Sequence, residues 1–149
     1  MENSKEIITG EDKTLSLFCH LSMVIGGIIL PIIIWAIKKE QSKFVRFHAL
    51  QSIFYHLAYS VLLAIIIVVF ALSIIFAGVG VRSIESMHSS SGMSAAIMII
   101  VFAFTVIIVF ALLGGIAYSI YIAVKAYQGE KTKIPIIGKI IYDKVYGGK

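Results

Sequence analysis

The stretch of sequence that decides the fold is FYHLAYSVLLAIIIVVFALSIIFA, residues 54–77, which contains no Asp, Glu, Lys or Arg. A helix of this length, with a rise of about 1.5 Å per residue, crosses a hydrocarbon core of about 30 Å. Of all 149 residues, 59% are hydrophobic and 14% are charged, whereas soluble domains have about 45–50% and about 25%. The sequence therefore predicts a membrane protein and excludes a soluble or disordered chain.

Charged residues are also missing from residues 14–37 and 86–124. We therefore predict three spans, at about 14–37, 54–78 and 94–124. The first span contains Gly26, Gly27 and Pro31, and the missing N–H of proline predicts a kink there. A re-entrant hairpin at Pro31 is the alternative for this segment.

Two shorter segments have apolar residues at helical spacing, with basic residues between them. They are about 42–53, with Phe44 and Phe47, and the tail 127–149, with Ile137 and Ile141. Such segments are typical of amphipathic helices at a membrane surface. The predicted fold class is an all-α membrane protein with three transmembrane helices and two interfacial helices on the cytoplasmic side. A polar tail (1–13), a transmembrane domain (14–126) and a basic amphipathic tail (127–149) follow along the chain.

The distribution of Lys and Arg predicts the orientation. With three spans, the first loop and the C-terminal tail share a side and hold ten basic residues, against three on the other side. Basic residues concentrate in the cytoplasm, so we expect the inner membrane, a cytoplasmic C-terminus and an external N-terminus. A re-entrant first segment would place the N-terminus inside. The residues expected at the membrane surface are Lys38, Lys39, Lys43, Arg46, Lys139 and Lys144.

Small residues follow one another at four-residue spacing in two of the predicted spans. Ala111, Gly115 and Ser119 form one row, and Ser22 and Gly26 form the other. Small residues let membrane helices approach closely, which suggests that Gly115 faces Gly26. The alternative is that glycine is simply common in membrane helices.

The spans contain no charged side chain and no motif for catalysis, phosphate binding or a metal cluster. We therefore expect no enzyme activity, no cofactor and no metal site. The net charge of +5 follows from the membrane orientation, so we expect no nucleic-acid partner. The candidate polar cluster is His48, Gln51 and His56, interpreted either as a recognition site or as a hydrated helix cap. In a straight first span, His20 would lie about 20 Å in depth from His56.

Three segments in order resemble a family of small prokaryotic membrane proteins of unknown function. They are His20-Leu21-Ser22 followed by residues 30–35 and Lys38-Lys39, then residues 44–52, and finally residues 126–130 with 134–138. This family is related to the Tic-twenty component of the chloroplast inner-envelope translocon and includes magnetosome-membrane proteins. The family has an Asn after its His-Ala-x-Gln stretch, where this chain has Ile53 and Phe54. The resemblance implies a role in a membrane complex without assigning an activity.

The leading hypothesis is a non-enzymatic multi-pass membrane protein that serves as a scaffold or accessory subunit of a translocation or assembly complex. Its partners would be the lipid bilayer and either further copies of itself or other membrane proteins. The first alternative is a small channel or transporter formed by an oligomer. The second is a lipid-responsive module that uses the two basic amphipathic helices.

Overall fold

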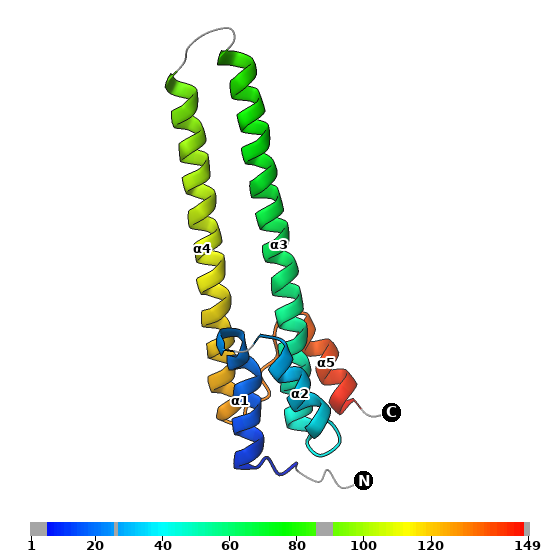
Figure 1. Cartoon of the computed structure of the whole chain (residues 1–149). Coiled ribbons are helices and arrows are strands. Elements are labelled where there is room, and N and C mark those ends of the chain that lie inside the picture. The colour runs from blue at the N-terminus through cyan, green and yellow to red at the C-terminus, as the bar shows by residue number, and fades with distance from the viewer. Residues whose placement is uncertain (1–5, 26, 86–90, 148–149) are drawn as a thin grey trace. The chain divides into compact units, whose positions relative to one another are not determined.

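The computed structural model describes residues 6–25, 27–85 and 91–147, with side chains for 6–25, 27–76 and 97–147. In these residues the structure consists of helices (Figure 1), which confirms the all-α prediction. They are α1 (Gly10–Ile25), α2 (Ile29–Lys38), α3 (Lys43–Glu85), α4 (Ser91–Tyr127) and α5 (Ile137–Tyr146). Two segments, Lys43–Phe76 and Ile97–Tyr127, are long and apolar enough to cross a membrane. These segments correspond to the predicted second and third spans, whereas the predicted first span at about 14–37 is not confirmed.

The chain divides into two compact units. The first comprises Met1–Ala58 and Gly115–Lys149, and the second comprises Tyr59–Gly114. Within the first unit lie α1, α2, the beginning of α3, the end of α4 and α5. The second unit consists of the remaining parts of α3 and α4.

Residues 14–37, predicted as one span with a kink, instead belong to two helices, because α1 ends at Ile25 and α2 begins at Ile29. Gly27 has a φ of +61°, a conformation that glycine adopts without the penalty paid by other residues. Pro31 is the third residue of α2, where its missing N–H has no intrahelical partner to lose. Pro31 therefore lies in a first turn and does not kink a long helix, while Gly26 lies outside the described residues.

Helices α1 and α2 form a short helical hairpin. They contact each other along their length, and Lys38 at the end of α2 forms a 2.7 Å ion pair with Glu11 at the start of α1. Cys19 of α1 and Ile34 of α2 pack with Val45 and Ala49 in one hydrophobic cluster. The hairpin therefore starts and finishes at the same end of the first unit.

Residues 42–53 do not form a separate helix on the membrane surface, because α3 continues through them into the long apolar stretch. Phe44, Val45 and Phe47 are fully buried. The α1–α2 hairpin covers Val45, and α5 covers Phe47 through Ile141 and Val145. The apolar residues that suggested a lipid-facing surface are thus covered by the protein itself.

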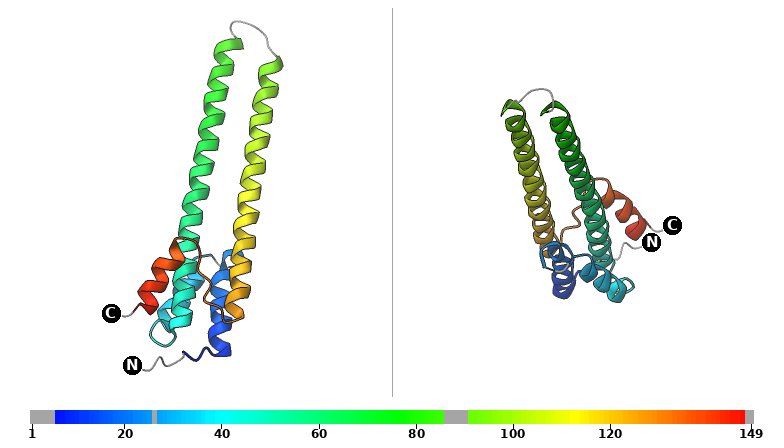
Figure 2. Two further views of the ribbon diagram at one scale, coloured as in Figure 1. Left: turned by 180° about the vertical axis from the view of Figure 1, so that it is seen from behind. Right: turned by 45° about the horizontal axis from the view of Figure 1, so that its top comes forward.

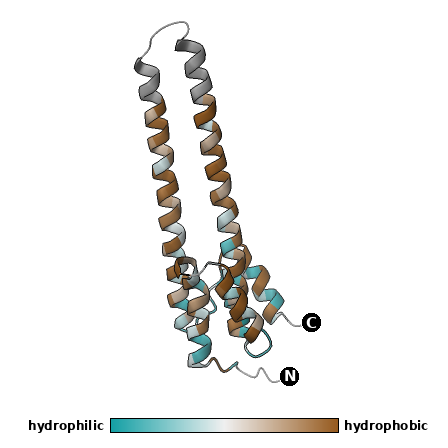
Figure 3. Ribbon diagram, viewed as in Figure 1, coloured by the Kyte–Doolittle hydropathy of each residue, from teal (hydrophilic) through white to brown (hydrophobic). Residues whose placement is uncertain are grey.

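The second unit is a pair of helices lying side by side (Figure 2). The hydroxyl of Tyr59 donates to the carbonyl of Ala111 at 2.7 Å, and the rings of Phe70 and Phe104 lie 5.6 Å apart. Apolar residues cover most of both helices (Figure 3). Large side chains such as Ile65 and Phe110 are exposed, as expected for helices that face lipid or other apolar helices.

Candidate functional site: a buried polar cluster

One face of α3 in the first unit is polar and buried. His48, Gln51, Ser52 and His56 are all buried, and their spacing of three and four residues places them on one side of a helix. Elements from both ends of the chain cover this face. Buried polar groups are costly unless they form hydrogen bonds, so their partners determine what the cluster does.

His20 of α1 and His48 of α3 form the centre of the cluster. The Nε2 atom of His20 lies 3.1 Å from Nδ1 of His48, and Nε2 of His48 lies 3.1 Å from the carbonyl oxygen of Glu130. A carbonyl only accepts, so Nε2–H of a neutral His48 donates to it, and His48 Nδ1 accepts from His20 Nε2–H. The pair therefore forms a directional chain of hydrogen bonds from α1 through α3 to the C-terminal tail.

This arrangement leaves Nδ1 of His20 as a buried acceptor with no partner among the described residues. It also corrects the expectation that His20 lies far from the histidines of α3. That expectation assumed a straight first span, whereas the break at Gly27 allows α1 to pack against the beginning of α3.

His56 lies within hydrogen-bond distance of two serines. Its Nδ1 donates to the carbonyl of Ser52 at 2.7 Å, and its Nε2 lies 3.5 Å from Oγ of Ser22. The hydroxyls of Ser22 and Ser52 both donate to the carbonyl of Cys19. These contacts join α1 to α3 one turn beyond the His20–His48 pair.

The row of small residues in α4 contacts both α1 and α3. The hydroxyl of Ser119 donates to the carbonyl of His20 at 2.6 Å, and the hydroxyl of Tyr55 donates to the carbonyl of Gly115 at 3.0 Å. Ala111 lies in the second unit and accepts from Tyr59, as described above. Two carbonyls of this row, those of Ala111 and Gly115, therefore accept hydrogen bonds from tyrosine hydroxyls. The suggested pairing of Gly115 with Gly26 cannot be compared with the structure, because Gly26 lies outside the described residues.

Gln51 attaches the C-terminal tail to α3. Its Nε2 donates to the carbonyl of Thr132 at 3.1 Å, and its Oε1 accepts from the N–H of Ile134 at 2.7 Å. A Cβ atom on Gly138 would lie 2.6 Å from Oε1 of Gln51 and 2.7 Å from Cα of Lys133. Glycine is therefore required at position 138 for the tail to approach Gln51 this closely.

The carboxylate of Glu6 lies at the beginning of α3, next to the polar cluster. The carboxylate of Glu6 accepts from the N–H of Phe44 at 2.8 Å and pairs with Lys131 at 2.7 Å. The ammonium of Lys131 lies 4.2 Å from the centre of the Tyr146 ring. Burial, together with the charge of Glu6, raises the pKa of Tyr146 above its ordinary value. Residues near both ends of the chain therefore meet at the beginning of α3.

The basic residues expected at the membrane surface have different surroundings. Lys38 pairs with Glu11, Lys39 lies 5.0 Å from the Trp35 ring centre, and Nε of Arg46 is buried without a partner among the described residues. Exposed side chains are found at Lys43, Lys139 and Lys144.

In the structure His48, Gln51 and His56 are buried, and His48 and Gln51 form hydrogen bonds with the chain's own tail. The two interpretations of this cluster, a recognition site and a hydrated helix cap, stay predictions. Among the described side chains, no group of three or more His, Cys, Asp and Glu could hold a metal ion. His20 stands out in the sequence as a polar residue of the predicted first span, but no local pattern pairs it, Glu130 or Thr132 with His48 and Gln51, because these residues lie far apart along the chain.

The profile of the magnetosome magnetite crystal formation protein family matches residues 11–141. A UPF0132 membrane protein of Methanocaldococcus jannaschii is 33% identical over 122 residues, which cover 82% of this chain and 77% of the relative. No solved structure matches the chain.

Proposed function

Because the chain belongs to the magnetosome magnetite crystal formation protein family, we propose that it is a non-enzymatic scaffold or accessory subunit of a complex in the cytoplasmic membrane. The UPF0132 relative is a membrane protein, and the two long apolar helices suit a bilayer. The relation to the Tic-twenty translocon component is a resemblance, and it supplies the idea of a translocation or assembly complex.

The observation that carries this proposal is that the buried polar side chains of the first unit form hydrogen bonds within the chain. His48 and Gln51 form hydrogen bonds with the chain's own tail, so these polar groups stabilise the first unit. The second unit meanwhile presents large apolar side chains outward, including Ile65, Leu72 and Phe110. A first unit held by internal hydrogen bonds and a second unit with exposed apolar helices suit a protein that binds other membrane helices.

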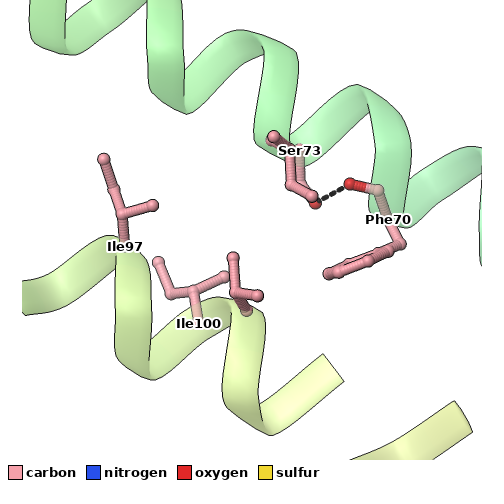
Figure 4. A pocket seen from close by; sticks show the side chains of 6 residues that line it. Phe70, Ser73, Ile97 and Ile100 are labelled. Atoms are coloured by element: carbon pink, nitrogen blue, oxygen red, sulfur yellow. Dashed lines mark hydrogen bonds between the residues drawn. The ribbon is translucent and has the colours of Figure 1, made fainter. Parts of the chain in front are cut away.

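A solute path would require polar groups along the helix pair of the second unit. A cavity of about 80 Å³ lies between its two helices. Phe70 and isoleucines make up most of its lining (Figure 4). The hydroxyl of Ser73 at this cavity donates to the carbonyl of Phe70, so it is occupied within its own helix. These features favour the scaffold over the oligomeric channel.

A test of the scaffold role is site-specific photocrosslinking in the native membrane from Ile65 or Leu72, both of which are exposed. The matched control is a crosslinker at Ser16, which is buried. The proposal expects discrete protein adducts from the exposed positions, either with another protein or with a second copy. Adducts no more frequent than those from Ser16, or solute flux through liposomes containing the purified chain, would contradict it.

We further propose that both termini are cytoplasmic, with two spans and a re-entrant α1–α2 hairpin. Glu6 contacts both Phe44 and Lys131, and Glu11 contacts Lys38, so the N-terminal residues share one end of the first unit with the first loop and the tail. This topology places 12 of the 13 Lys and Arg residues on one side and only Arg82 on the other. The bias toward basic residues in the cytoplasm is stronger than with three spans.

Cysteine labelling tests this topology in intact cells. A membrane-impermeant maleimide should label Ser90→Cys directly, but should label Ser4→Cys only after the cells are permeabilised. The unmodified chain is the control, because its single cysteine, Cys19, is buried. Labelling of Ser4→Cys in intact cells would contradict this proposal and support three spans with an external N-terminus.

A further inference from the structure

An apolar groove runs between α3 and α5 within the first unit. Phe54 of α3 and three residues of α5, Ile137, Ile140 and Ile141, line it, and its volume is about 110 Å³. Phe54 and Ile140 are 48% and 65% exposed. The groove is therefore open to the surroundings, next to the cluster in which Ile141 packs on Phe47.

Helix α5 runs antiparallel to α3 at this groove. The rings of Tyr142 and Tyr146, toward the C-terminal end of α5, lie 5.8 and 5.9 Å from the Phe47 ring. The N-terminal residue Ile137 instead lies beside Phe54, which is two turns further along α3. One end of the groove thus faces the polar beginning of α3, and the other faces its long apolar stretch.

Lys144 lies on α5 one turn beyond the groove residues Ile140 and Ile141. It follows Ile141 by three residues and Ile140 by four, so it shares their face of α5, and helical side chains lean over the preceding turn. Lys144 is exposed and forms no ion pair with any residue that the structure describes.

Lys139 is also exposed on α5 but has a different position. Successive 100° steps place it about 160° around α5 from the groove residues Ile137 and Ile141, and about 140° from Lys144. Asp143 follows it by four residues and lies on its side of the helix. Lys144 therefore lies on the groove side of α5 and Lys139 does not, although both are exposed lysines of the same helix.

We propose that the groove binds an anionic phospholipid, with an acyl chain along Phe54 and Ile140 and the phosphate at Lys144. The apolar lining matches hydrocarbon, and a lysine near the membrane surface attracts anionic headgroups. The orientation is consistent as well, because the lysine lies toward the polar beginning of α3 and Phe54 toward its apolar stretch. This site would fix α5 against α3 through a lipid as well as through protein contacts.

The test uses the full-length chain, purified in detergent and depleted of lipid. It is titrated with phosphatidylglycerol or with phosphatidylcholine of the same acyl chains, and bound lipid is counted by native mass spectrometry. Lys144→Gln should weaken phosphatidylglycerol binding about fivefold, the equivalent of about 1 kcal/mol for one basic residue. Lys139→Gln is the matched control and should change the affinity less than twofold.

A second pair of variants tests the acyl-chain part of the site. Ile140→Ser should weaken binding of phosphatidylglycerol, whereas Ile120→Ser, at an exposed residue of α4, should not. Soluble glycerol phosphate at the same concentrations should not compete.

Three results would overturn the proposal. They are equal binding of the two lipids, equal losses in Lys139→Gln and Lys144→Gln, and competition by glycerol phosphate. If Ile140→Ser instead separates a dimer and leaves lipid binding intact, the groove holds a second copy and the lipid site is wrong. The crosslinking test of the scaffold role does not depend on any of these outcomes.

Discussion

At the scale of single residues, the side chain of Gln51 attaches the C-terminal tail to α3 through two hydrogen bonds. One amide satisfies both a carbonyl and an N–H of the segment Thr132–Ile134, and His48 adds a bond to Glu130 two residues earlier. These bonds run along residues 130–134, which belong to no helix. A glutamine suits this role because it carries a donor and an acceptor on one planar group.

The first prediction concerns Gln51→Ala. The variant leaves the N–H of Ile134 without its acceptor in a buried place, at a cost of about 1–3 kcal/mol. We expect the backbone amides of the tail and α5 to exchange with solvent about 5- to 150-fold faster, as measured by hydrogen exchange with mass spectrometry. Gln41→Ala is the control, since Gln41 is exposed. Equal exchange in both variants would show that Gln51 does not hold the tail.

At the scale of elements, α1 begins with a reciprocal pair of hydrogen bonds. The N–H of Thr9 donates to the carboxylate of Asp12 at 3.0 Å, and the N–H of Asp12 donates to Oγ1 of Thr9 at 3.1 Å. This is a capping box in which Asp12 occupies the third helical position. The helix itself starts at Gly10, directly after Thr9.

The second prediction concerns the stability of α1. Thr9→Ala removes the N-terminal cap and should lower the free energy of unfolding by about 0.5–2 kcal/mol. Thr14→Ala is the matched control, because Oγ1 of Thr14 bonds only to the carbonyl of Gly10 within the helix, and a change within about 0.5 kcal/mol is expected. Thermal unfolding followed by circular dichroism measures both variants.

The same cap should make the first unit sensitive to acid. Burial raises the pKa of Asp12, but the hydrogen bonds from Thr9 and Ser42 and the charge of Lys38 together outweigh this effect, so the pKa lies below its ordinary value of 3.8. A depressed pKa in the folded state means that the stabilisation is complete above the unfolded value and is lost as the pH falls through the folded value. Thr9→Ala should therefore lose less stability than the unmodified chain between pH 5 and pH 3, taken as rough limits of this range. An unchanged acid dependence would mean that the cap does not set it.

At the scale of the whole molecule, residues from the beginning, the middle and the end of the sequence form the first unit. Glu6, Phe44 and Lys131 are joined by two short contacts. Because an N–H in the first turn of a helix lacks an intrahelical acceptor, the carboxylate of Glu6 both caps α3 and holds the tail. The second unit depends on no such meeting of distant segments, since its two helices are neighbours along the chain.

The third prediction compares two carboxylates near the N-terminus. Glu6→Ala removes a charged hydrogen bond and an ion pair together, and should cost about 1.5–3 kcal/mol. Glu11→Ala removes only its pair with Lys38, in which the Glu11 side chain is 66% exposed, and should cost about 0–1 kcal/mol. Denaturant unfolding in mild detergent measures both. A larger loss in Glu11→Ala would contradict the central place given to Glu6.

The sequence by itself determined the properties that depend on neighbouring residues. Long runs without charge predicted apolar helices, the spacing of apolar residues predicted helical segments near 42–53 and 136–145, and the scarcity of polar motifs predicted a membrane protein. Hydrophobicity and helical periodicity act over a few turns, so they can be read locally. His48, Gln51 and His56 also stood out locally as polar residues in apolar surroundings.

Only the tertiary structure decided what those residues contact and how the first segment folds. His20 and His48 are 28 positions apart and Ser119 and His20 are 99 apart, so no local pattern could pair them. The apolar face at 42–53 predicted contact with something apolar, but lipid and protein satisfy that requirement equally well. The break at Gly27 decided between them, because it folds α1 and α2 back onto the beginning of α3 and makes a buried cluster out of an expected membrane surface.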